Sequence, residues 1–121
     1  MPVQKYKRGA SRTPVHIHEN EDETVYMIDG EMKAIIAGEA QVIKAGETLF
    51  MRRGIAHQLM NVSGKPMHYI LLCTPAGFDG FVEAAGRLGG PDEQPAPPAP
   101  EEIARLTEAA PRFGITLLAG W

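Results

Sequence analysis

The chain has 121 residues, of which 44% are hydrophobic and 22% charged, and its formal net charge is −3 with histidine neutral. This length and composition are typical of one soluble globular domain that can bury a core of its own. The chain carries no basic stripe, so it is not expected to bind nucleic acid, and no apolar run is long enough for a transmembrane helix.

The single cysteine, Cys73, excludes a disulfide within the chain, and residues 1–14 lack the apolar region of a signal peptide. We therefore expect a cytoplasmic protein with no membrane association. Cys73 lies in an apolar run and is interpreted as an inert core residue rather than a nucleophile.

Short β-strands separated by turn residues are predicted for the first two thirds of the chain. Residues 3–8 alternate loosely and predict an edge strand or a strand exchanged with a partner, and residues 9–14 are rich in turn formers. Further strands are predicted at residues 15–18, 23–28, 31–37, 40–43, 48–51, 56–61 and 67–73. Asp29 and Gly30 predict a hairpin turn between the second and third of these. Many short strands at this spacing are typical of a sandwich or jelly-roll barrel.

After residue 76 the pattern changes to helices. A helix over residues 78–85 is predicted by apolar side chains at helical spacing, at Phe78, Phe81, Val82 and Ala85. Glycines at 86, 89 and 90 are expected to end it, and the proline-rich residues 91–100 predict an extended linker.

A second helix is predicted over residues 101–109, with Glu102 in its first turn and with Ile103 and Leu106 facing inward. An apolar tail follows, with Phe113, Ile115, Leu117, Leu118 and Trp121. Such a tail should be docked on a protein surface. We therefore divide the chain into a barrel, residues 1–76, and a C-terminal helical extension, residues 77–121, packed on the barrel or on a partner subunit.

One group of polar residues has the chemistry of a metal site. His16 and His18 lie two apart on a predicted strand, so both imidazoles point to one face, about 6.6 Å apart along the strand. Two rings tilted across that gap can meet at one ion. A turn at residues 19–22 would bring Glu23 back beside them. The third imidazole must come from elsewhere, and His57 is the candidate.

Two stretches resemble the two conserved motifs of the cupin superfamily. His16-x-His18, four residues, Glu23, six residues and Gly30 resemble the first motif, and residues 46–61, GETLFMRRGIAHQLMN, resemble the second. The two motifs occur in the expected order, about 20 residues apart, and this makes the resemblance specific.

Two positions depart from the family pattern. Arg52 occupies a place that is usually proline, and the glycine ahead of the first motif is one residue out of place, at Gly9. That proline shapes a turn and binds no metal, so the metal interpretation is unaffected. Residues 21–23 and 74–78 further resemble single-domain bacterial cupins of the quercetin 2,3-dioxygenase-like group.

The resemblance implies an all-β fold, a cupin-type jelly-roll β-barrel to which we add short C-terminal helices. It also implies a metal site formed by His16, His18, Glu23 and His57. Three imidazoles and one carboxylate suit a single divalent transition metal, Fe, Mn, Ni, Co or Zn.

The resemblance to quercetinase-like cupins implies a metal-dependent oxidoreductase, a dioxygenase acting on a small enolisable or hydroxylated organic substrate. In this interpretation the metal binds the substrate oxygen, Glu23 is the catalytic base and O₂ attacks the activated carbon. The alternative is a non-catalytic metal-dependent cupin that binds or senses a small molecule. A metal-free sugar isomerase is disfavoured, because all four ligand positions are filled.

The remaining polar residues near these motifs are interpreted as structural. Glu19, Glu21 and Asp22 are most simply an acidic turn exposed to solvent, and His68 lies outside both motifs as a structural or, at most, a pocket residue. The segment ahead of the first motif is short, so a strand from a partner is expected to complete a sheet. We therefore predict a homodimer.

Overall fold

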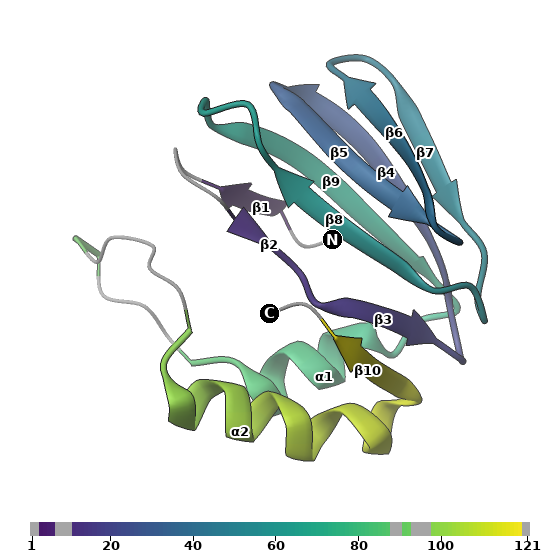
Figure 1. The fold of residues 1–121 in the computed structure, drawn as a ribbon. Coiled ribbons are helices and arrows are strands. Elements are labelled where there is room, and N and C mark those ends of the chain that lie inside the picture. Colours follow the sequence, from purple (N-terminus) through teal and green to yellow (C-terminus); the bar gives the residue numbers. More distant parts are fainter. Residues whose placement is uncertain (1–2, 7–10, 88–90, 93–97, 120–121) are drawn as a thin grey trace.

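The chain folds into two antiparallel β-sheets that face each other as a jelly-roll barrel (Figure 1). The computed structural model describes residues 3–6, 11–87, 91–92 and 98–119. The first sheet contains, in spatial order, β1 (Val3–Tyr6), β9 (Met67–Thr74), β4 (Asp22–Asp29) and β7 (Thr48–Met51). The second contains β10 (Ile115–Ala119), β3 (Val15–His18), β8 (His57–Asn61), β5 (Glu31–Ile36) and β6 (Glu39–Lys44), with β2 (Ser11–Arg12) paired to β8. The predicted all-β jelly-roll barrel is confirmed.

Alternate residues of the strands point inward and form the barrel core. Along β4, Glu23, Val25 and Met27 are buried, whereas Tyr26 and Ile28 are exposed. The apolar core consists of Val25, Met27, Met32, Ala34, Ile43, Leu49, Met51, Leu59, Met67, Tyr69 and Leu71. Burying one large apolar side chain of this kind contributes about 2 kcal/mol. The same alternation carries the carboxylate of Glu23 into the interior.

The corner at Asp29 and Gly30 joins the two sheets. β4 pairs with β7 and β9, while β5 pairs with β6 and β8, so the predicted hairpin is wrong at this corner. Gly30 has a φ of +79°, and a Cβ there would overlap the carbonyl oxygen of Pro66 and the backbone of Met67. Asp29 and Gly30 do form a tight turn, but this turn leads the chain from one sheet to the other. The same two residues also favour a hairpin, so the sequence alone does not distinguish the two kinds of turn.

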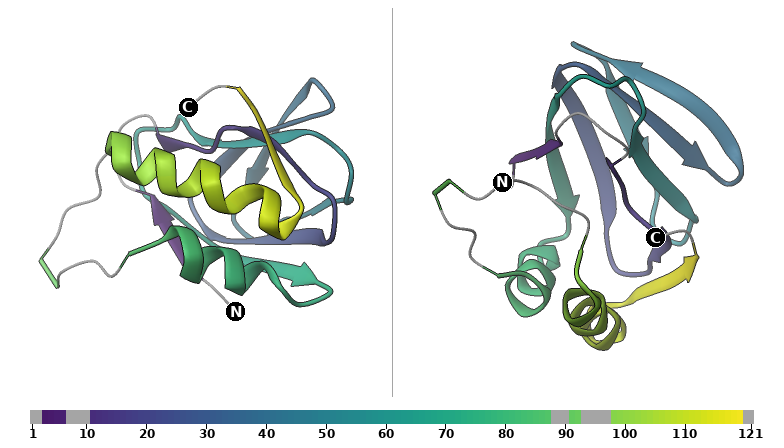
Figure 2. Two further views of the ribbon diagram at one scale, coloured as in Figure 1. Left: turned by 90° about the horizontal axis from the view of Figure 1, so that it is seen from below. Right: turned by 60° about the vertical axis from the view of Figure 1, so that its left-hand side comes forward.

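The C-terminal segment packs two helices beside the barrel (Figures 1 and 2). α1 (Phe78–Ala85) and α2 (Pro100–Ala109) lie side by side, and the 3₁₀-helix η1 (Ala110–Phe113) leads into β10, which pairs with β3. A second apolar cluster joins these elements through Phe81, Ala85, Ala109, Ala110 and Ile115. Gly80 allows Phe113 to approach α1 closely, since a Cβ at this position would lie 2.8 Å from its ring.

Both predicted helices are confirmed, and the second begins one residue earlier than expected, at Pro100. The predicted apolar tail contains η1 and then a strand of the barrel sheet. Several predicted features lie outside the described residues: Gly9, the glycines at 89 and 90, residues 93–97 of the proline-rich segment, and Trp121. Neither helix in the described part of the chain has the length and hydropathy needed to cross a membrane.

Candidate metal centre

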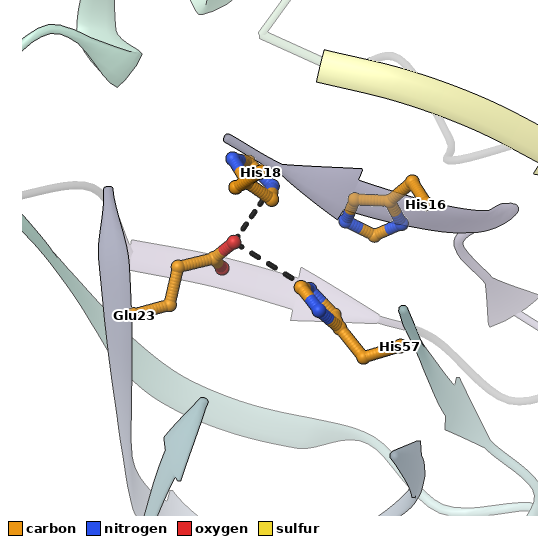
Figure 3. A group of neighbouring side chains, drawn as sticks. All are labelled: His16, His18, Glu23 and His57. Atoms are coloured by element: carbon orange, nitrogen blue, oxygen red, sulfur yellow. Dashed lines mark ion pairs between the residues drawn. The ribbon is translucent and has the colours of Figure 1, made fainter. Parts of the chain in front are cut away.

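Three histidines and one glutamate meet between the two sheets (Figure 3). His16 and His18 lie on β3, and His57, the first residue of β8, is the cross-strand partner of His16. Glu23 reaches the group from β4 in the opposite sheet. One ligand atom from each of the four side chains lies within 4.8 Å of the others. The structure thus brings together all four residues that the sequence analysis selected.

One ring nitrogen of each histidine faces an oxygen acceptor. In His16 and His57 the Nδ1 atom lies 2.7 and 3.2 Å from the backbone carbonyl oxygen two residues earlier. In His18 the Nδ1 atom lies 2.6 Å from a carboxylate oxygen of Glu21. Because a carbonyl or carboxylate oxygen accepts, Nδ1 carries the proton in each neutral ring. The Nε2 lone pairs are therefore available to a metal ion.

Burial and neighbouring charges set the pKa values of the group. Burial, with the nearby His57 ring, lowers the pKa of His16 to about 4, so this ring is neutral at neutral pH. Burial raises the pKa of Glu23, but His18 and His57 together outweigh it, and the pKa falls to about 2. Burial lowers the pKa of His18, whereas Glu23 and Glu21 raise it by more, so it lies above 6.5.

When the rings are neutral and carry their proton on Nδ1, two buried polar atoms at the centre have no hydrogen-bond partner within the described part of the chain: Glu23 Oε1 and His57 Nε2. The Oε1 atom lies 2.6 Å from His18 Nε2 and 3.5 Å from His57 Nε2 (Figure 3). Unpartnered buried polar atoms cost free energy, and a cation between them would satisfy both. Three imidazoles and a carboxylate are suitable ligands for a divalent transition metal. The residues present therefore fit such an ion.

An aromatic ring and a thiol lie beside the centre. The Phe78 ring, from α1, lies 5.2 Å from the His18 ring between centroids and in an edge-on arrangement. Cys73 is the cross-strand partner of Glu23. Burial, together with the charges of Glu23 and Glu21, raises the pKa of the Cys73 thiol to about 12. Cys73 is therefore a neutral thiol, as expected for an unreactive residue.

The turn between β3 and β4 differs from the predicted solvent-exposed acidic turn. Glu21 is 4% exposed and its carboxylate contacts His18. Asp22 accepts hydrogen bonds from the backbone and the side chain of Arg53. Glu19 is exposed, as expected. The prediction was wrong for Glu21 because the turn folds this side chain under the strand, and no local pattern separates it from Glu19.

The fourth histidine, His68, lies outside the group. It is half-buried on β9 between the buried residues Met67 and Tyr69, so it faces the opposite side of the sheet from the core. Its cross-strand partner on β4 is Asp29. His68 is therefore suitable as a control position in tests of the metal centre.

The fold and the site together define a small jelly-roll protein with a histidine–carboxylate group between its sheets. The sequence profile of the Cupin domain family matches residues 2–73, which is more than half of the chain. The chain therefore belongs to the cupin family. No curated protein sequence gives a significant match.

Among the solved structures that resemble the chain are three proteins, and the names of two of them state an activity. The protein TT1209 from Thermus thermophilus has a TM-score of 0.56 and 25% identity, over 60% of this chain and 69% of that one. A predicted oxalate decarboxylase from Thermotoga maritima has a TM-score of 0.55 and 28% identity, over 59% of this chain and 61% of that one. An oxalate oxidase has a TM-score of 0.51 and 26% identity, over 57% of this chain and 38% of that one.

Proposed function

We propose that this cupin is a metal-dependent dioxygenase that acts on a small enolisable or hydroxylated organic substrate, like the quercetinase-like cupins that its sequence resembles. The observation that carries the proposal is the buried group of His16, His18, Glu23 and His57. Structural zinc sites are usually closed and rich in cysteine. The single cysteine, Cys73, does not belong to this group, and this supports a reactive centre rather than a structural zinc site.

The four side chains would have distinct roles in this reaction. A divalent ion bound by them would keep open positions for a substrate oxygen and O₂ and would make a bound hydroxyl or enol more acidic. Glu23 is the proton acceptor, because its carboxylate is buried and ionised at the centre, and its Oε1 atom faces the three rings there. Phe78 and the barrel core limit the access of water.

The similar structures support a small, oxygen-rich substrate. Two of them are named for activity on oxalate, and they share 28% and 26% identity with this chain. Oxalate itself offers two oxygen atoms that can chelate one metal ion. A cupin site that accepts such a ligand is compatible with a hydroxyketone, a diketone or a catechol, which can chelate in the same way.

The test is oxygen consumption by protein loaded with each candidate metal, measured with a panel of flavonols, diketones and catechols. We expect uptake of O₂ with at least one substrate class. The Glu23→Gln variant should lose about 100-fold or more of that rate, in the range found for general bases. The control His68→Gln lies outside the centre and should retain the rate. Metal binding without O₂ uptake on any compound would contradict the proposal and favour the small-molecule binder or sensor.

A further inference from the structure

We propose that Glu21 is a positioning residue of the metal centre, which orients His18 and places a second carboxylate behind its ring, on the side away from the ion. The inference rests on the proposed metal site and concerns a residue outside its four ligands. Glu21 lies in the turn between β3 and β4, three residues after His18, and is 4% exposed. A carboxylate is seldom buried to this extent without a specific partner.

The partner of the Glu21 carboxylate is the ring of His18. Its Oε1 atom lies 2.6 Å from Nδ1 of His18, the distance of a short charge-assisted hydrogen bond. The opposite ring nitrogen, Nε2, points to Glu23 at the centre, 2.6 Å from Oε1. One imidazole therefore bridges a carboxylate on the outside and the metal centre on the inside.

His18 differs in this respect from the other two histidines. His16 and His57 each donate through Nδ1 to a backbone carbonyl oxygen of their own segment, an acceptor that any sequence would provide. The acceptor of His18 is a side chain and depends on the residue at position 21. A carboxylate acceptor carries a full charge, so it should raise the basicity of Nε2 more than a carbonyl does.

The position of Glu21 is fixed by contacts on both sides of the turn. The backbone N–H of Glu19 donates to the carbonyl oxygen of Gly114 over 2.8 Å, and the Asn20 side chain donates to that of Phe113 over 3.3 Å. On the other side, Asp22 binds Arg53. The turn is thus held against the C-terminal segment and the loop before β8. Glu21 can therefore act as a fixed support for the ring.

The test compares Glu21→Gln and Glu21→Leu with Glu19→Gln and Glu19→Leu, which change an exposed carboxylate of the same turn. Zinc affinity is measured by chelator competition, and the cobalt-loaded proteins are compared by visible absorption. Nitrogen NMR of the zinc-loaded protein reports the state of the His18 ring. Circular dichroism and urea unfolding show whether each variant folds.

Glu21→Leu should lower zinc affinity about 10–100-fold, the usual range for a residue that supports a metal ligand. Glu21→Gln should have a smaller effect and keep Nδ1 of His18 protonated, because its amide oxygen can still accept. Both should shift the cobalt spectrum, and neither Glu19 variant should do so. If Glu21→Leu does not fold, the near-isosteric Gln variant decides the question by its spectrum.

Unchanged zinc affinity and an unchanged cobalt spectrum in the folded Glu21 variants would overturn this inference alone. A loss of stability with an unchanged spectrum and His18 signal would also overturn it, since Glu21 would then serve the fold only. Wild-type protein that binds neither zinc nor cobalt would instead overturn the proposed metal site on which the inference rests.

Discussion

At the residue scale, His18 and Glu23 form an ion pair before any metal binds, with 2.6 Å between Nε2 and Oε1. The pKa of Glu23 is lowered from 4.5 to about 2, so its contribution to stability is present above pH 4.5 and is lost as the pH falls toward 2. The pKa of His18 is raised above 6.5, so its contribution is present below pH 6.5 and is lost as the pH rises through the higher value. The pair therefore stabilises the metal-free protein most in mildly acidic solution.

Metal binding should release a proton from His18, because the ion takes the lone pair of a ring that is protonated in the metal-free protein. At pH 6.5 the raised pKa leaves this ring more than half protonated. We expect at least about half a proton per ion, seen as a difference in calorimetric binding heat between two buffers of different ionisation enthalpy. Identical heats in both buffers would show that His18 is already neutral.

The sequence predicts the role of only some of the acidic residues around the turn between β3 and β4. Glu23 follows from the resemblance to the cupin motif and from the return of the chain after a turn. Glu21 does not, because Glu19, Glu21 and Asp22 are all polar residues in a turn-prone stretch. Which of them folds beneath His18 depends on contacts with Gly114, almost a hundred positions away along the chain. A contact between residues so far apart along the chain cannot be predicted from a single sequence.

At the element scale, the C-terminal segment supports the strand that carries two of the proposed ligands. β10 pairs with β3, with Ile115 opposite His18 and Leu117 opposite His16, and the register shifts only after Leu117. Gly114, just ahead of β10, has a φ of +69°, and a Cβ there would overlap the side chain of Asn20. The turn that carries Glu21 and the end of the chain are therefore packed tightly together.

Replacing Gly114 with alanine should destabilise the protein by more than a comparable change elsewhere. The control is Gly46→Ala, which has a similar φ of +85° but nothing within 4 Å of the new Cβ. The control should cost about 1 kcal/mol through backbone strain. Gly114→Ala should cost about 1 kcal/mol more, because Asn20 must leave its hydrogen bond to Phe113. Urea unfolding measures both free energies, and equal values would show that the Asn20 contact does not hold the turn.

The elements that the sequence predicts well are those with a strong local pattern. The strand at Thr48–Met51 and the helix at Phe78–Ala85 have the predicted bounds. β10 was predicted only as an apolar docked tail, although its exposed Thr116 and Leu118 lie on either side of the less exposed Leu117. Residues 115–119 form a strand because they pair with the edge of β3. A prediction from sequence cannot use that pairing, because the position of β3 in the sheet is not known beforehand.

At the scale of the whole molecule, the barrel and the C-terminal segment share a sheet. The division of the chain at residue 76 stays a prediction, and the structure shows that β10, from the second part, lies next to β3 (Figure 1). Phe78 packs against both apolar clusters and contacts His18. Changes in the extension should therefore reach the metal centre through β3 and through this ring.

In the single chain β1 pairs with β9 at the edge of the first sheet, where a partner strand was expected. The homodimer stays a prediction, and we now place its interface on the outward face of this sheet. Apolar side chains on this face are 41–59% exposed in the single chain: Tyr26, Ile28, Phe50 and Leu72. Thr24 lies opposite both Phe50 and Leu72 in the sheet register, so these groups form one surface. A second copy would cover it.

Sedimentation velocity at micromolar concentration measures the assembly. We expect a dimer for the wild type and a monomer for Phe50→Asp. The control Val42→Asp changes a residue of similar exposure on β6, in the other sheet, and should leave the dimer intact. A wild-type monomer would contradict the prediction.

The central claim is that His16, His18, Glu23 and His57 bind one metal ion, and the metal content of His57→Ala tests it most directly. His57 is the proposed ligand that lies farthest along the chain from the others, and it alone comes from β8. Protein purified without chelators is measured by elemental analysis beside the wild type and the control His68→Ala. We predict close to one ion per chain in the wild type and in the control, and loss of most of the metal from folded His57→Ala. Full metal content in that variant would contradict the account.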